Sequence, residues 1–449
     1  MRNRFRIFRE IFPAARLYMA GALLVLVFTG GFFFDSLFLA GKIMLLFIAT
    51  AILADFYLLF LTGRELIQVT RETPEKFSNG DDNIVSLHIR NNHVFPLNAL
   101  IIDELPVQFQ VRDFQLKVSL KPAEEKQMEY KLRPVQRGDY QFGKTNVYVT
   151  CQIGLISRRY CYNNDPVAIP VYPSFLNIRK YEFLAVSNRL TEAGIKRIRK
   201  IGQHSEFDQI REYVRGDDIR SVNWKATAKK AKLMSNQYQE ERSQQVYNLI
   251  DMGRTMKMPF HEMALLDYAV NSSLVLSNTA VFKHDKTGLI TFNTAIHTFM
   301  KAERKNNTIA RMLEILYNQD TRYAESNYEL LYVAIKRMIP QRSLLILYTN
   351  FETLASLTRQ LPSFQKIARN HLLLVVLFEN AEITGFRKKE AKTLEEIYAQ
   401  TIAEKFIHDK NLIVKALNNH GILSILTRPH DLSVNLINKY LELKDRQLI

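Results

Sequence analysis

Two long apolar runs open the chain. The first, from Leu17 to Phe34, carries no charge, and the second, from Leu37 to Leu61, is interrupted only by Lys42 and Asp55. At about 1.5 Å per helical residue, each is long enough to cross a hydrocarbon core of roughly 30 Å. A cleaved signal peptide would show one short apolar run rather than two. The pattern therefore predicts a hairpin of two transmembrane helices within residues 1–63.

The charges around these runs predict the orientation of the hairpin. Five arginines precede the first run (Arg2, Arg4, Arg6, Arg9 and Arg16), and Arg64 follows the second. The positive-inside rule places both ends in the cytoplasm, which predicts a two-pass protein of a bacterial inner membrane. Asp55 would cost about 2.5 to 3.5 kcal/mol at mid-bilayer, so it either has a function or reaches interfacial water.

Residues 64–175 change to short alternating runs separated by turn residues. Strands are expected at Ile84–Ile89, after the turn-rich segment 79–83, and at Asn146–Val149. The turn at Arg137–Tyr140 suggests a hairpin between Val135 and Phe142. Several strands at this spacing predict a β-sandwich of immunoglobulin-like type. No cluster of ligands or nucleophiles stands out, which favours a spacer or a binding module.

From residue 245 onward, strand and helix patterns alternate. Continuous apolar runs predict strands at Val246–Asp251, Gly288–Phe292, Ser343–Tyr348 and Leu372–Phe378. Helical patterns cover about Phe260–Ser277, Asn307–Tyr317 and Tyr328–Met338. Such alternation indicates a parallel sheet covered on both faces, so residues 245–449 are expected to form a doubly wound α/β domain.

Composition adds a strongly basic balance and few cysteines. The formal net charge is +16, which is compatible with nucleic acid, anionic lipid or an acidic protein partner. No zinc finger, helix-turn-helix or RNP-type motif accompanies the short basic clusters, so nucleic acid is not expected and the lipid bilayer explains the charge more simply. Cys151 and Cys161, the only cysteines, fit no metal or disulfide motif and are interpreted as free thiols.

Residues 176–244 form a linker that contains a dense charged motif. Its candidate binding or interdomain residues are Arg211, Glu212, Tyr213, Gly216, Asp217, Asp218, Arg220, Asn223 and Trp224. Taken alone, the composition of such a segment favours a solvated face of mixed charge. The run Arg-Glu-Tyr, Gly-Asp-Asp, Arg, Asn-Trp, together with Val135 to Tyr140, resembles the signature of a bacterial family known as domain of unknown function family fifty-eight. Members are typically membrane-anchored and carry a von Willebrand factor A-like domain.

The resemblance raises the question of a metal site. Von Willebrand factor A domains place an Asp-x-Ser-x-Ser motif for a metal-ion-dependent adhesion site after the first strand. This chain reads Asp251-Met252-Gly253-Arg254-Thr255, so Gly253 replaces the first serine. Ser326 stands where a threonine is expected, and Asn350 replaces an aspartate. Mg²⁺ prefers oxygen ligands, and the loss of a hydroxyl and a negative charge predicts a degenerate site at Asp251, Thr255, Ser326 and Asn350.

Motifs for common enzyme classes are absent. The chain has no phosphate-binding loop, no Gly-x-Ser-x-Gly elbow and no His-Glu-x-x-His helix, so we expect no enzymatic activity and no cofactor. The resemblance implies partnership with a MoxR-type AAA+ ATPase and other von Willebrand A proteins. The prediction is a membrane-anchored adaptor or scaffold. The alternatives are a metal-dependent binding protein that uses residual Mg²⁺ affinity, and a membrane-tethered nucleic-acid binder.

Overall fold

The computed structural model describes residues 10–61, 66–162, 168–176, 207–214, 222–238, 243–260, 263–305, 307–321, 323–380 and 393–448. The chain divides into two compact units, Met1–Tyr172 and Pro173–Ile449. The boundary lies close to the predicted end of the β-rich domain at residue 175. The N-terminal helices and the β-sandwich belong to the same unit, although the sequence suggested separate parts.

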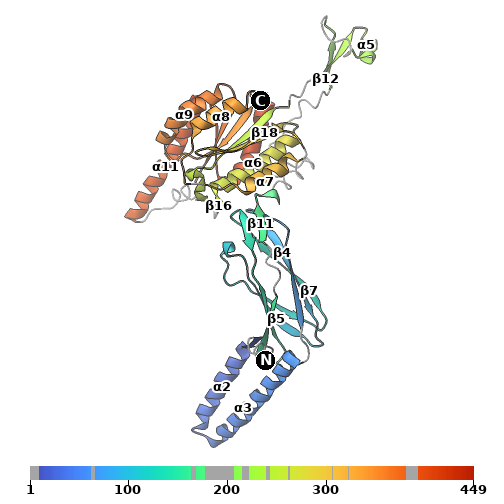
Figure 1. Cartoon of the computed structure of the whole chain (residues 1–449), viewed down its shortest axis with the longest axis vertical. Helices are drawn as coiled ribbons and strands as arrows, with labels where there is room; N and C mark the ends of the chain where they lie inside the picture. The colour runs from blue at the N-terminus through green and yellow to red at the C-terminus, as the bar shows by residue number, and fades with distance from the viewer. Residues whose placement is uncertain are drawn as a thin grey trace. The chain divides into compact units, whose positions relative to one another are not determined.

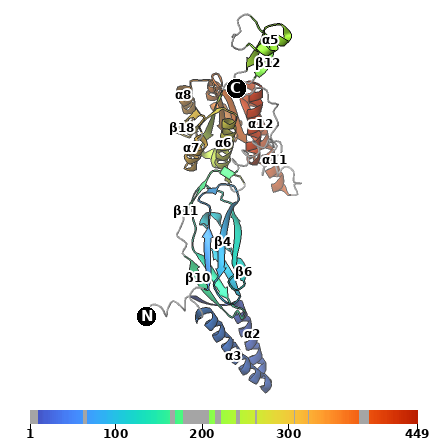
Figure 2. The ribbon, with the colours of Figure 1, turned by 90° about the vertical axis from the view of Figure 1, so that its right-hand side faces the viewer.

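Two apolar helices pack side by side in the first unit (Figures 1 and 2). Helix α2 spans Ala15–Gly31, and helix α3 spans Asp35–Phe56 and continues as a π-helical turn, η1, over Tyr57–Leu61. Gly41 permits their close approach, because a Cβ there would lie 2.9 Å from the Phe28 ring. Within the described residues, one stretch, Asp35–Phe60, is long and apolar enough to cross a membrane, whereas α2 is shorter.

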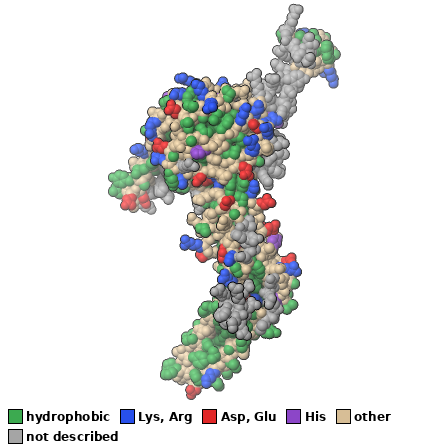
Figure 3. Space-filling view, in the orientation of Figure 1, with side chains coloured by type: hydrophobic (Ala, Val, Ile, Leu, Met, Phe, Trp, Pro, Cys, Tyr) green, Lys and Arg blue, Asp and Glu red, His purple; other side chains and the backbone are tan. Residues whose placement is uncertain are grey.

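The outer surface of this helix pair is apolar. Large hydrophobic side chains are exposed along both helices, among them Leu26 at 68% and Phe47 at 71%. Hydrophobic side chains are frequent over α2 and α3 in Figure 3, with isolated charged ones near their turn. Exposed apolar surface on this scale indicates contact with a membrane or another protein.

The β-sandwich follows the alternation predicted for it. In strand β4, Asn83–Asn91, the side chains of Val85, Leu87 and Ile89 are buried and their neighbours are not. Three strands form one sheet in the order β2 (Ile67–Glu72), β4 and β7 (Glu125–Leu132). The facing sheet has the order β1 (Ile11–Pro13), β10 (Ile156–Tyr162), β9 (Thr145–Thr150), β5 (Leu97–Asp103) and β6 (Leu116–Leu120).

The expected hairpin at Arg137–Tyr140 is wrong. Gly138–Gln141 is itself strand β8, and it pairs antiparallel with β11, Ala168–Tyr172, which also pairs with β3, Phe77–Ser78. Gly138 enters this strand with φ of +129°, a conformation that glycine alone adopts easily. Tyr140 is buried and its hydroxyl donates to the carbonyl oxygen of Gln136 at 2.9 Å. Burial of Tyr140 thus sets the strand, in place of a turn.

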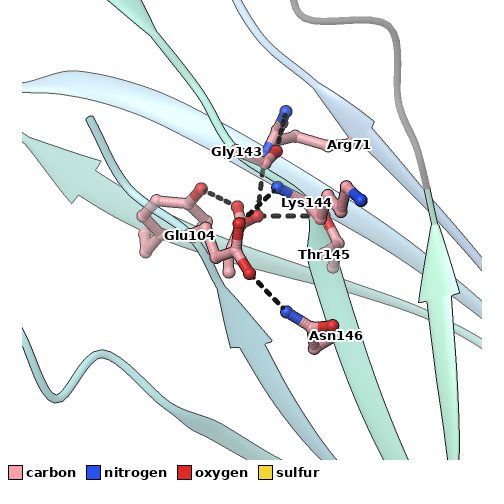
Figure 4. Close-up of polar contacts among 8 residues, drawn as sticks. Arg71, Glu104, Gly143, Lys144, Thr145 and Asn146 are labelled. Carbon is pink, nitrogen blue, oxygen red and sulfur yellow. Dashed lines mark hydrogen bonds and ion pairs between the residues drawn. The ribbon is translucent and has the colours of Figure 1, made fainter. Parts of the chain in front are cut away.

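A buried ion pair links the two sheets of the sandwich (Figure 4). Asp103 of β5 accepts from the guanidinium of Arg71 on β2 at 2.7 Å, and both side chains are almost fully buried. The hydroxyls of Tyr130 and Thr145 donate to the same carboxylate at 2.6 and 2.9 Å. Beside it, Glu104 accepts from the backbone N–H of Lys144 and from Asn146. Complete pairing offsets the cost of burying these charges.

The two cysteines are free, as the sequence indicated. Cys151 is buried, and burial, with a smaller contribution from the charge of Asp55, raises the pKa of its thiol to about 12. It is therefore an inert thiol of the sandwich core.

The second unit contains the predicted doubly wound α/β domain. Its sheet has the order β18 (Ile296–Glu303), β17 (Lys286–Phe292), β14 (Gln245–Asp251), β19 (Leu344–Tyr348), β20 (Leu372–Phe378) and β21 (Leu423–Thr427). All neighbouring strands are parallel except the edge strand β18. In the order of the chain this sheet reads 3-2-1-4-5-6, the arrangement typical of doubly wound folds.

Helices cover both faces of this sheet (Figures 1 and 2). One core joins the sheet to α6 (Leu265–Phe282), α7 (Thr308–Tyr317) and α12 (Leu432–Asp445). The other joins it to α8 (Tyr328–Met338), α9 (Leu354–Ala368) and α11 (Leu394–Asn419). Side chains of β14 alternate between the two cores, with Ile250 in the first and Leu249 in the second.

One helix begins later than expected. The sequence suggested a start near Phe260, but α6 begins at Leu265, because Pro259–Phe260 and Met263–Ala264 pair as the short strands β15 and β16. Phe260 packs into the core from strand β15. In the sequence, a buried apolar residue at this position looks like part of the helical pattern.

Candidate functional site

The crevice at the carboxyl ends of β14 and β19 is the natural site of the α/β domain. Strand order reverses between these two strands, and open α/β sheets bind their ligands at such a point. Asp251 is the last residue of β14, and Thr349 and Asn350 follow β19. Ser326 lies just before α8. A depression of about 300 Å³ here is lined by all four predicted metal-site residues, Asp251, Thr255, Ser326 and Asn350.

Asp251 is buried and surrounded by neutral donors. Its Oδ1 accepts from the backbone N–H of Gly253 at 2.8 Å and from the hydroxyl of Ser326. Its Oδ2 lies 2.8 Å from the Tyr328 hydroxyl and 2.7 Å from the Thr349 hydroxyl. These two hydroxyls are also 2.7 Å apart, and since each has one proton, two of the three contacts are hydrogen bonds at any instant.

These neutral donors form hydrogen bonds with the carboxylate of Asp251. Burial and then the neighbouring carboxylate raise the pKa of Tyr328 well above its ordinary value, so the phenol stays protonated and able to donate. A carboxylate offers about four lone-pair positions, and the contacts around Asp251 engage both of its oxygens. Asp251 therefore orders the loop and the start of α8.

The arrangement does not fit a hard divalent ion. Ser326 and Asp251 bond to each other, and the side-chain oxygen of Asn350 accepts from the ammonium of Lys410 on α11. Gly253 has no room for the missing serine, because a Cβ there would lie 2.3 Å from Ser326 Oγ. Thr255 lines the depression within η5, Arg254–Lys257. Among the described residues, no group of three or more His, Cys, Asp or Glu side chains could hold a metal.

Exposed residues border the depression. Arg254 and Glu325 form an exposed ion pair at 3.5 Å, and the backbone N–H of Arg254 donates to Ala324. Tyr323 is 82% exposed, and the ammonium of Lys257 lies 4.1 Å from its ring centre. Arg359, in the second turn of α9, is also exposed and lines the depression. Arg254, Glu325 and Arg359 line the depression, and we call them, together with Tyr323 two residues before Glu325, the rim.

The charged motif forms a small structural module in its described parts. Strand β12, Phe207–Glu212, contains Arg211 and Glu212 and pairs antiparallel with β13, Met234–Tyr238. Between them lies the short helix α5, Trp224–Lys230, which Asn223 caps by accepting the N–H of Ala226 at 3.0 Å. Asn223 also donates to Asn236 at 2.9 Å.

Of the remaining described motif residues, some form contacts within this module and one is exposed. Tyr213 donates its backbone N–H to Leu233, and Glu212 pairs with Lys232 at 2.7 Å on the surface. That contact lowers the pKa of Glu212. Trp224 is 70% exposed. Gly216, Asp217, Asp218 and Arg220 lie outside the described residues.

Three residues of the site were not anticipated from the sequence. Thr349 precedes Asn350 at a strand end and could have been suspected from that position. Tyr328 was noted only as the start of a helix, and its contact with Asp251 spans 77 residues. Lys410 lies mid-helix, 60 residues beyond Asn350, and no local pattern marks it.

Comparison with known proteins finds one family model that matches the motif and most of the α/β domain. Residues 209–383 match the model described as "Protein of unknown function DUF58". Over 155 residues the chain is 28% identical to the "Uncharacterized protein YeaD" of Bacillus subtilis (strain 168). This match covers 34% of this chain and 37% of that protein. The match thus spans a little over a third of that relative's length.

Two solved structures show distant likeness. The conserved hypothetical protein BatB of Bacteroides thetaiotaomicron is 12% identical, with a TM-score of 0.30, and the match covers 46% of this chain and 100% of that one. The CARDB domain of a Pyrococcus furiosus protein, crystallised with di-metal ions, is 16% identical with a TM-score of 0.17. That match covers 25% of this chain and 96% of the domain.

Proposed function

Because residues 209–383 match the model of a family of unknown function, we propose a function from the architecture of the chain itself. The protein is a non-enzymatic, membrane-anchored adaptor that binds a protein partner at the rim of its α/β domain. The apolar surface of α2 and α3 supports the anchor, with both helices as a two-pass hairpin whose ends, like the soluble parts, face the cytoplasm of a bacterium.

The observation that carries this proposal is the saturation of Asp251. Its carboxylate is held by an amide and by hydroxyls, so the loops around it are ordered without a metal ion. Ordered loops lose little conformational entropy when a partner binds. The position of Asp251 at the end of the first strand of the sheet supports a von Willebrand factor A-like domain whose metal site is vestigial.

The composition of the rim supports a protein partner. Exposed tyrosine and arginine are the residues that most often dominate binding energy at protein interfaces. Arg254 and Arg359 line the depression, and the exposed Tyr323 lies two residues before Glu325, which also lines it. From the family resemblance, the partner is an AAA+ ATPase of the MoxR type or another von Willebrand A protein.

Binding of a purified MoxR-type ATPase to the detergent-solubilised full chain tests this proposal. We expect Tyr323→Ala and Arg359→Glu to weaken binding at least about tenfold, or about 1.4 kcal/mol each. Arg337→Glu is the matched control, because this exposed arginine lies in the last turn of α8, at the end of the helix away from the rim.

The same assay with and without Mg²⁺ separates the alternatives. Binding that is equal in both conditions and lost in the rim variants supports the adaptor. Binding that requires Mg²⁺ and is lost in Asp251→Asn would favour a metal-dependent binding protein. Absence of ATPase binding under every condition, with all variants folded, overturns the partner assignment.

A further inference from the structure

A second hollow of the α/β domain adjoins the depression at Asp251, because Asn350 and Glu352 line both. It is a cavity of about 400 Å³ at the carboxyl ends of β19, β20 and β21, closed on one side by α11. Its volume falls in the range of small-molecule sites, which are mostly apolar with a few placed polar groups. The apolar part of its wall is formed by Phe260, Leu265, Phe378, Phe406, Ile407 and Leu426.

One cation faces this apolar wall. Lys410, on α11, lines the cavity and donates to the side-chain oxygen of Asn350. An ammonium has three N–H donors, and within the described residues Asn350 supplies the single acceptor for Lys410. Asn350 is buried and accepts through its side-chain oxygen in this contact, so its NH₂ group is a further donor at this end of the cavity. Lys410 and Asn350 therefore present N–H donors to this end of the cavity.

Two carboxylates line the cavity and compensate the cation only in part. Glu379 lines the cavity and is paired with Arg428 at 4.0 Å. Glu352 is exposed at the edge, and no ion pair joins it to Lys410 among the described side chains. Burial lowers the pKa of Lys410 to about 8, while the charge of Glu352 opposes this shift. An ammonium with so little compensation in an apolar setting is stabilised by an additional anion.

We propose that this cavity binds a carboxylate attached to an apolar body. The carboxylate accepts from Lys410 Nζ and from the amide of Asn350, and the apolar part packs against Phe406, Ile407 and Leu426. A free apolar carboxylic acid and the C-terminal residue of a peptide share this chemistry. The inference does not depend on the adaptor function, because it concerns the purified protein alone.

Calorimetric titration of the full chain in lipid nanodiscs tests this assignment. The probes are phenylpropionate and its uncharged amide, which differ only in the group that would contact Lys410. We expect the acid to bind at least about tenfold more tightly than the amide at pH 7. Lys410→Met should reduce acid binding at least about tenfold and leave the amide unchanged. Lys415→Met, an exposed lysine on the same helix, is the matched control and should bind like the unmodified protein.

A second variant tests the apolar wall. Ile407→Trp should reduce binding of acid and amide alike, because the larger side chain fills the cavity. Affinity of the acid should also fall as pH rises above about 8, since the anion binds the charged form of Lys410. Circular dichroism of each variant establishes that it is folded.

A short peptide that ends in leucine, with a free or an amidated C-terminus, distinguishes a small apolar acid from a peptide C-terminus as the ligand. Tighter binding of the free-terminus peptide than of phenylpropionate assigns the cavity to peptide C-termini, and the reverse assigns it to small acids. The proposal is overturned if acid and amide bind equally, if neither acid nor free-terminus peptide binds at millimolar concentration, or if folded Lys410→Met binds the acid as the unmodified protein does.

Discussion

The carboxylate of Asp55, near the end of the apolar helix α3, accepts the backbone N–H of Leu155 in the β-sandwich at 2.8 Å. It also accepts the N–H of Ile156 at 3.0 Å, and its side chain is fully buried. The sequence suggested either a function or contact with interfacial water for this acid, and the structure adds a structural contact to these alternatives. Asp55 joins the helix pair to the sheet that contains β10.

Replacement of Asp55 should therefore loosen this joint. Asp55→Ala leaves two buried N–H groups without an acceptor, at a cost of about 3 kcal/mol. Asp55→Asn keeps an oxygen and should cost about 1 kcal/mol. Hydrogen exchange of the peptide that contains Leu155 and Ile156 measures the effect, with roughly 100-fold faster exchange expected for the alanine variant. Equal exchange in all three proteins would show that the joint is held elsewhere.

Loss of Arg71 should destabilise the sandwich strongly. Arg71→Met leaves Asp103 buried without its counter-charge, which typically costs about 3 to 5 kcal/mol. Arg90 and Glu125 form an exposed pair at 3.2 Å in the same unit, so Arg90→Met serves as the control and should cost less than about 1 kcal/mol. Denaturant-dependent hydrogen exchange of β4 and β7 reports the stability of this unit. Similar effects of the two substitutions would contradict the assigned role of Asp103.

Restoring a serine at Gly253 should damage the site rather than repair it. A side chain there meets Ser326 Oγ at 2.3 Å and Asp251 Oδ1 at 3.0 Å, so Gly253→Ser should destabilise the α/β domain by about 1 to 3 kcal/mol. Ser326→Ala removes the nearest obstructing atom. The double variant should therefore be more stable than the sum of the two single effects predicts, as thermal unfolding would show. Additive effects would mean that the loop adjusts freely.

The stability of the α/β domain should depend on pH through Lys410. Its pKa is lowered from 10.5 to about 8, so the unfolded chain binds more protons between these values, and the free energy of unfolding rises with pH across this window. The total change in the free energy of unfolding is at most about 3.4 kcal/mol. Lys410→Met lacks this contribution, so the stability of the variant relative to the unmodified protein should fall as pH rises from 8 to 10. A constant difference in denaturation experiments at the two pH values would contradict the lowered pKa.

Local patterns predicted the α/β domain well. Strand β20 matches its apolar run, Leu372–Phe378, and α8 matches Tyr328–Met338, because continuous apolar strands and amphipathic helices are encoded in neighbouring residues. Contacts between distant residues were not predictable in this way. The bond from Lys410 to Asn350 and the contact of Tyr328 with Asp251 depend on how the sheet folds. Asp251 itself was identified because it ends a predicted strand, and ligands of open α/β sheets bind beyond the carboxyl ends of the strands.

The same limit explains the misassigned elements of the β-sandwich. Gly138 and Tyr140 have the composition of a turn, and only pairing with the distant strand β11 makes them part of a sheet. The segment Ile11–Pro13 is too short to be recognised as a strand, yet it pairs with β10. In the sequence, both apolar helices lie between this segment and β10.

That placement of β1 has a consequence for synthesis of the protein. Ser157 donates to the carbonyl oxygen of Phe12, 145 residues earlier in the chain. At about 5 to 20 residues per second, the ribosome needs on the order of ten seconds to supply the partner of β1. The sheet edge along β10 closes only after both helices have left the ribosome, so the helix pair is synthesised before the sandwich can be completed.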